Sequence, residues 1–129
     1  MPVIPSVMSL HLQYRLWIAE LNFDINVLRI FADYLAELRS KGKEAEAKTK
    51  SDYFEKQFTG LRTEIDELRH EMHIAKMKLG AVARDDKPFD YKLFNKENQL
   101  PLKKRLSVYK ANFKKINVEF EAYEGQWLS

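Results

Sequence analysis

Residues 10–38 read LHLQYRLWIAELNFDINVLRIFADYLAEL, the first stretch of the chain in which apolar side chains recur at helical spacing. One seam steps by four and three residues, as one face of an α-helix requires. Its members are Tyr14, Ile18, Leu21, Ile25, Leu28, Ala32 and Leu35, and apolar residues continue around the helix at Leu10, Leu16, Trp17, Phe23, Val27, Ile30, Phe31, Tyr34 and Leu38. A helix that is apolar over most of its circumference is normally a buried one. This stretch therefore predicts a central helix with more apolar surface than one small bundle covers.

Two further stretches show the same periodicity with a narrower seam, which is typical of coiled-coil helices. The first seam is Phe54, Phe58, Leu61, Ile65, Leu68, Met72, Ala75 and Leu79, and the second is Leu102, Leu106, Tyr109, Phe113, Ile116, Phe120, Tyr123 and Trp127. We expect helices at about residues 9–40, 44–82 and 98–126, with Gly42 and Gly80 as stops and Pro101 in the first turn of the third helix. The alternative for the second helix is another turn through residues 81–84. These features predict an all-α fold, an antiparallel up-down-up three-helix bundle with long coiled-coil-like helices, forming one domain over residues 1–129.

The connection between the second and third helices is expected at about residues 83–97, which is long for a compact domain. Four apolar residues make it able to pack, namely Phe89, Tyr91, Leu93 and Phe94. We expect a lid over one end of the bundle. The alternative is an arm that docks on a partner or on a second copy of the chain.

Composition excludes several classes of protein. The 129 residues include no Cys, so disulfides, thiolate metal sites and Cys nucleophiles are absent. No stretch approaches the ~20 uninterrupted apolar residues that span a bilayer, and the beginning of the sequence lacks the pattern of a signal peptide. With 45% hydrophobic and 32% charged residues, the chain reads as a soluble protein, and we expect it in the cytoplasm.

The histidines, carboxylates and hydroxyls show no complete catalytic or metal-binding pattern. Glu67 and His70 have the Glu-x-x-His spacing of di-iron bundles, but those proteins use two such motifs and this chain has one. The buried seam at Leu68 and Met72 also places His70 on the solvent side of its helix. No Gly-x-Ser-x-Gly motif and no Gly-rich phosphate loop occurs. We therefore expect no enzyme, no cofactor and no metal site.

The third helix carries the net positive charge of the chain, which is +3 overall. Its first half holds six basic residues with no acid among them: Lys103, Lys104, Arg105, Lys110, Lys114 and Lys115. The helix macrodipole favours acidic residues near the N-terminus and basic residues near the C-terminus, which is the reverse of this arrangement. Local helix stability therefore does not explain the position of the basic residues. We expect internal pairing, with residues 103–115 beside about 66–79 and with Asp66, Glu67 and Glu71 as partners. The alternative is an anionic partner, either nucleic acid or an acidic membrane surface.

The surplus apolar surface of the first helix leads to the functional hypothesis. A bundle helix buries a stripe of about 100–140°, and the first helix exceeds this width. We expect a non-enzymatic scaffold or adaptor that acts through protein–protein contact, most simply as a homodimer that forms a larger helical bundle. The predicted interface consists of Leu16, Phe23, Val27, Ile30 and Tyr34. One alternative function is anion binding by the third helix, and another is a small export or assembly chaperone that shields a partner's helix.

Overall fold

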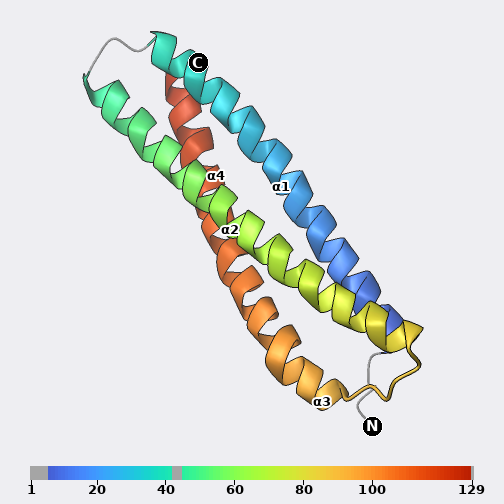
Figure 1. The fold of residues 1–129 in the computed structure, drawn as a ribbon. Helices are drawn as coiled ribbons and strands as arrows, with labels where there is room; N and C mark the ends of the chain where they lie inside the picture. Colours follow the sequence, from blue (N-terminus) through green and yellow to red (C-terminus); the bar gives the residue numbers. More distant parts are fainter. Residues whose placement is uncertain (1–5, 42–44, 129) are drawn as a thin grey trace.

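Three long helices form the protein, as the sequence predicted. The computed structural model describes residues 6–41 and 45–128, with side chains for 6–41 and 48–125. α1 (Val7–Lys41) and α4 (Leu100–Leu128) run in the same direction, and α2 (Ala45–Arg84) runs antiparallel to both (Figure 1). No strand occurs within the two described ranges. The all-α, up-down-up three-helix bundle is confirmed.

Helix α1 begins two residues earlier than expected because Ser6 caps it. The Ser6 Oγ accepts a hydrogen bond from the Ser9 amide at 3.0 Å, which satisfies one of the donors that a helix N-terminus leaves free. At the other end, α1 extends to Lys41. The expected stop at Gly42 lies outside the described residues, as does residue 44, where the second helix was expected to begin.

Most residues of the predicted seams are buried in the core. All eight seam residues of α2 are buried, and those of α4 are buried up to Tyr123 apart from the half-buried Phe113. The side chain of Trp127 lies outside the described residues. On α1 the seam is buried except for Ile18, which is half-buried, and Ala32, which is exposed. The expectation that Ala32 belongs to the core is wrong, because its short side chain lines a shallow groove between α1 and α2 instead of filling it.

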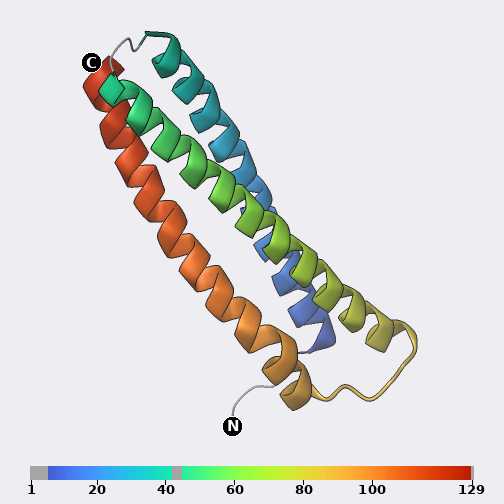
Figure 2. The same ribbon diagram turned by 60° about the vertical axis from the view of Figure 1, so that its left-hand side comes forward.

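A cluster of aromatic rings holds α4 against the other two helices. The ring of Phe120 lies 5.0 Å from that of Phe31, 5.2 Å from that of Phe54 and 5.1 Å from that of Phe58, measured between centroids. The backbones of α1 and α2 approach each other more closely than α4 approaches either. Figure 2 shows α4 running alongside α2. Large rings therefore set the distance of α4 and bury the apolar area that retains it.

Helix α2 continues past Gly80 to Arg84, so the preferred stop at Gly80 is wrong and the alternative of another turn through residues 81–84 is confirmed. The end is made by Asp86, whose φ of 50° places it in the left-handed region. The Lys87 amide then donates to the Val82 carbonyl at 3.2 Å, which is the six-to-one bond of a Schellman motif. Asp tolerates the left-handed conformation better than most residues, which explains how the helix ends without Gly.

We expect Gly80→Ala to stabilise the protein. Gly80 lies in a helix interior, and a Cβ added there meets no atom within 4 Å. Ala is favoured over Gly at such positions by about 1 kcal/mol. Urea denaturation should show this increase in the free energy of unfolding, whereas Asp86→Ala, which removes a residue suited to positive φ, should lower it. An unchanged or lowered stability for Gly80→Ala would contradict this assignment of the helix end.

The connection after α2 is much shorter than the predicted loop at 83–97. Residues 91–99 are helical, first as α3 (Tyr91–Phe94) and then as the π-helical turn η1 (Asn95–Gln99), which leads directly into α4. Asp90 starts this helical segment by accepting a hydrogen bond from the Leu93 amide at 3.1 Å. Pro101 lies in the first turn of α4, as expected, but helical residues precede that turn.

The π-helical turn explains how the helix passes through Pro101. Proline lacks an amide hydrogen, and its ring clashes with the carbonyl four residues earlier. In η1 the Leu100 amide instead donates to the Asn95 carbonyl, five residues back, which widens the turn. π-Bulges are among the few devices that let an α-helix absorb such an interruption.

Residues 89–94 pack over one end of the bundle, as expected for a lid. Phe94 is buried, Phe89 and Tyr91 are half-buried against the core, and Leu93 is exposed. The ring of Tyr14 on α1 makes an edge contact with Phe94 at 6.2 Å, and its hydroxyl donates to Gln99 Oε1 at 2.8 Å. These contacts fix the start of the third helical segment against α1.

Candidate interaction surface

Helix α1 carries a second apolar face on the side away from the core. Four of the five predicted interface residues are exposed, with fractions of 52% for Leu16, 67% for Phe23, 52% for Ile30 and 45% for Tyr34, while Val27 is half-buried. Leu12, which is 55% exposed, lies on the same face, although it was not among the interface residues predicted from the sequence. The signal for it was available, because Leu12 lies four residues before Leu16. We call the six residues Leu12, Leu16, Phe23, Val27, Ile30 and Tyr34 the outer stripe.

Helical geometry places the outer stripe on one narrow face. At about 100° of rotation per residue, its side chains fall within an arc of about 60°. The centre of that arc lies about 130° from the centre of the buried residues of α1. From Leu12 to Tyr34 the stripe runs along about 33 Å of helix. α1 thus has two apolar faces, of which its own bundle covers one.

The edge of the outer stripe meets α4 at a small cavity of about 320 Å³. Phe23 lines it together with Glu20, Asp24, Lys110 and Phe113. Lys110 Nζ lies 3.0 Å from Glu20 Oε2, which ties α4 to α1 beside Phe23. Both side chains of this ion pair are more than half exposed, so it contributes little free energy but fixes the register.

A part-buried hydrogen bond lies at the wall of this cavity. The hydroxyl of Tyr109, a residue only 1% exposed, donates to Asp24 Oδ2 at 2.7 Å. Burial raises the pKa of Asp24, the hydrogen bond from Tyr109 and the charge of Lys110 lower it, and the charge of Glu20 raises it. Burial and then the bond to Asp24 raise the pKa of Tyr109 well above its usual value of 10. The bond between Tyr109 and Asp24 therefore joins α4 to α1 beside Phe23.

We expect the protein to lose stability as the pH rises above about 10. Burial raises the pKa of Tyr14 to about 12, and that of Tyr109 is raised further. The folded state therefore retains protons that the unfolded state releases above pH 10, so the free energy of unfolding is retained below that pH and falls above it. In an absorbance titration at 295 nm, Tyr14 and Tyr109 should ionise last, together with the loss of the helical circular dichroism signal. Tyr109→Phe should remove one late-titrating group, and ionisation of all tyrosines near pH 10 with helicity intact would contradict the prediction.

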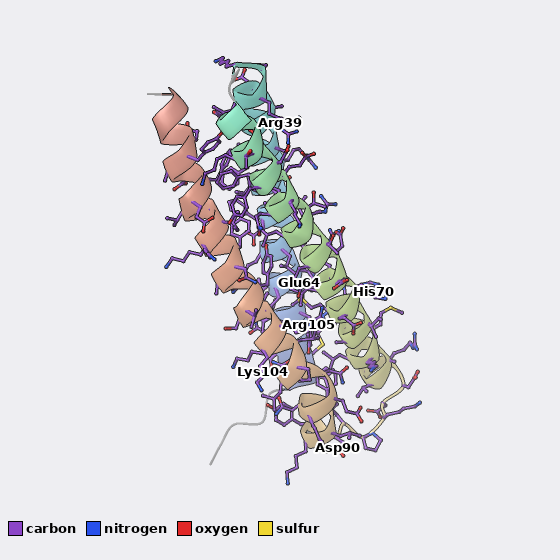
Figure 3. The ribbon with its side chains drawn as sticks, turned by 90° about the vertical axis from the view of Figure 1, so that its left-hand side faces the viewer. Arg39, Glu64, His70, Asp90, Lys104 and Arg105 are labelled. Carbon is purple, nitrogen blue, oxygen red and sulfur yellow. The ribbon has the colours of Figure 1, made fainter. Side chains whose placement is uncertain are left out.

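The six basic residues of α4 divide into two groups. Arg105 Nη2 lies 3.6 Å from Glu64 Oε1 and 3.7 Å from Glu67 Oε2, between α4 and α2 (Figure 3), and Lys110 pairs with Glu20. The other four are exposed, and no ion pair is found for them within the described residues: Lys103, Lys104, Lys114 and Lys115. Internal pairing therefore accounts for part of the basic cluster.

The expected partners and register of this pairing need correction. Only Glu67 of the expected acids is used by α4, since Asp66 pairs within α2 with Arg62 at 3.2 Å and Arg69 at 2.9 Å. The Tyr53 hydroxyl donates to Glu119 at 2.8 Å, so residues 103–115 lie beside about 57–69 of α2 and not beside 66–79. The register differs because the connection after α2 is short. Residues 91–99 are already helical and lie along the part of α2 where the third helix was expected to begin.

The histidines of the described residues do not form a cluster with one another or with the carboxylates. His70 and His73 are exposed, with His70 directed away from the bundle (Figure 3), and His11 is half-buried. In the described part of the chain, no three His, Asp or Glu side chains are placed to hold a metal ion. A groove of about 500 Å³ between α2 and α4 is lined by polar side chains such as Gln57 and Asn112. A search of the described helices for one long and apolar enough to cross a membrane finds none.

Comparison with known proteins adds no relative to this picture. No protein-family model matches the chain, and neither a curated protein nor a solved structure matches it. The functional argument therefore depends on the geometry of the outer stripe.

Proposed function

We propose that this protein acts through protein–protein contact without catalysing a reaction, and that it self-associates as a homodimer through the outer stripe. The observation that carries the proposal is the exposure of Phe23, Leu16 and Ile30 together on one face of α1. Large apolar side chains that are exposed singly need no explanation, whereas a contiguous row of them typically marks an interface. In the dimer, α1 lies at the centre, with α2 and α4 outside.

The hydrophobic effect supplies the driving force for this association. Burial of a fully exposed Leu, Ile or Phe side chain is favourable by about 1.5–3 kcal/mol. In the dimer, each outer-stripe residue gains the share of this free energy that corresponds to its exposed fraction within one chain. The rigid helix scaffold limits the entropy that ordering would otherwise cost. We place the dimer in the cytoplasm, which the lack of Cys in all 129 residues supports.

Co-retention of two copies tests the proposal. An affinity-tagged chain and an untagged chain are expressed together, purified on the tag and washed at moderate salt. We expect the untagged chain to be retained in an amount close to that of the tagged chain, because hydrophobic association is not weakened by salt. Passage of all the untagged chain through the column at high protein concentration would contradict self-association.

A further inference from the structure

Without Val27, the spacing of the outer stripe is the same when read from either end. Leu12, Leu16, Phe23, Ile30 and Tyr34 are separated by four, seven, seven and four residues. Leu16 and Ile30 therefore lie at equal distances from Phe23, and so do Leu12 and Tyr34. Ala19 and Val27, a small and a larger residue, are placed symmetrically in the same way. In an isologous contact between antiparallel helices, residues at equal distances from the two-fold axis meet, and each such pair occurs twice. This spacing therefore brings apolar side chains opposite apolar side chains.

Charges at one edge of the stripe fit the same arrangement. Arg15 lies eight residues before Phe23 and Asp33 ten residues after it, and both are exposed at the same angular position on α1. The two are about 27 Å apart within one chain, so they cannot pair there. Within the described residues, neither one forms an ion pair. Against an antiparallel second copy, their axial offset is about 3 Å, which the Arg side chain spans easily.

A parallel pairing of the same faces would leave these charges unpaired. A two-fold axis parallel to the helices places the two copies of Arg15 on opposite flanks of the interface, and Asp33 of either copy lies about 27 Å away along the helix axis. Opposite charges set partner orientation in helical pairs, so the antiparallel pairing is favoured. The row of apolar residues alone is compatible with parallel and with antiparallel pairing, whereas the charges favour antiparallel pairing.

We propose, on the basis of the proposed self-association, that two copies pair through α1 in antiparallel orientation about a two-fold axis at Phe23. Leu16 then packs against Ile30 of the partner subunit, and Phe23 packs against Phe23 of the partner subunit. Arg15 forms an ion pair with Asp33 of the partner subunit, and this pair occurs twice. Helices that pack at a shallow angle, about 8–10 Å apart, allow this interdigitation along the whole stripe.

Disulfide cross-linking tests the orientation, because the natural chain has no Cys. A tagged Leu16→Cys chain and an untagged Ile30→Cys chain are mixed, allowed to exchange and oxidised mildly. We expect a cross-linked heterodimer from the mixture and little product from either chain alone. In the antiparallel pair, two copies of position 16 are about 21 Å apart, far beyond disulfide reach. Val118→Cys, on the exposed surface of α4, is the matched control and should not cross-link.

The molar mass of each reduced Cys variant separates the two proposals. If the variants are dimers but two Leu16→Cys chains cross-link to each other, the antiparallel register is wrong and self-association stands. Monomers at all concentrations would overturn self-association as well. Dimers with the mixed cross-link support both proposals.

A charge-reversal cycle tests the ion pairs independently. We expect Arg15→Glu and Asp33→Arg each to raise the dimer dissociation constant about tenfold, from two lost pairs and two repulsive contacts. The double variant should return to within about threefold of the natural chain. Sites this far apart in one chain are independent, so restoration must come from contact between copies. A double variant as weak as the combined single variants would overturn the proposed pairing.

Discussion

Phe23→Glu is expected to dissociate the dimer while the bundle remains folded. Phe23 is 67% exposed within one chain, so its replacement removes few contacts inside the bundle. Substitutions at such surface positions usually change the free energy of unfolding by less than about 0.5 kcal/mol. At the centre of the proposed interface, however, Phe23 has the position of a hot spot, whose loss typically costs at least about 2 kcal/mol of binding. A buried carboxylate adds a further cost.

Sedimentation equilibrium over a range of concentrations measures this effect. We expect the dissociation constant of Phe23→Glu to rise by about 100-fold or more, and that of Ile30→Glu to rise in the same direction. The control is Val118→Glu, which adds the same charge at an apolar position of α4 that is 58% exposed and outside the outer stripe. Retention of dimer mass and stability by both α1 variants would count decisively against the interface.

The second large effect is expected for Phe120→Ala in the aromatic cluster. Phe120 is 2% exposed, and its ring contacts those of Phe31, Phe54 and Phe58, so it joins α4 to both other helices. Truncation of a buried Phe typically costs about 3–5 kcal/mol through lost burial and the remaining cavity. This is a large fraction of the roughly 5–15 kcal/mol that stabilises a domain.

Urea denaturation followed by circular dichroism measures the loss in Phe120→Ala. Phe113→Ala is the comparison, because Phe113 is only half-buried and should cost clearly less. A loss below about 1.5 kcal/mol for Phe120→Ala would mean that the cluster does not hold α4 in place.

The helices and their buried faces could be predicted from the sequence because they depend on local periodicity. On α2, the positions from Phe54 to Leu79 that step by four and three residues are the buried ones. The same periodicity predicted the surplus apolar surface of α1, since Phe23 and Ile30 fall outside the core seam. Their exposure follows from the width of one bundle contact, which is a general property of helices.

The segment before α4 could not be predicted, because two local signals pointed away from helix. The polar run Asn95–Gln99 has no apolar period, and Pro101 normally marks a helix boundary. Tertiary contacts override both signals, with Phe94 buried against Tyr14 and Gln99 bonded to the Tyr14 hydroxyl. The charge register between α2 and α4 was misplaced for the same reason, since it depends on the length of the connection.

The molar mass of the natural chain in solution tests the central claim most directly. Light scattering on a sizing column, over a tenfold range of protein concentration, distinguishes one copy from two. We predict a mass near twice 15.3 kDa at the higher concentrations, with the outer stripe buried between copies. A mass of 15.3 kDa throughout the range would contradict self-association through α1.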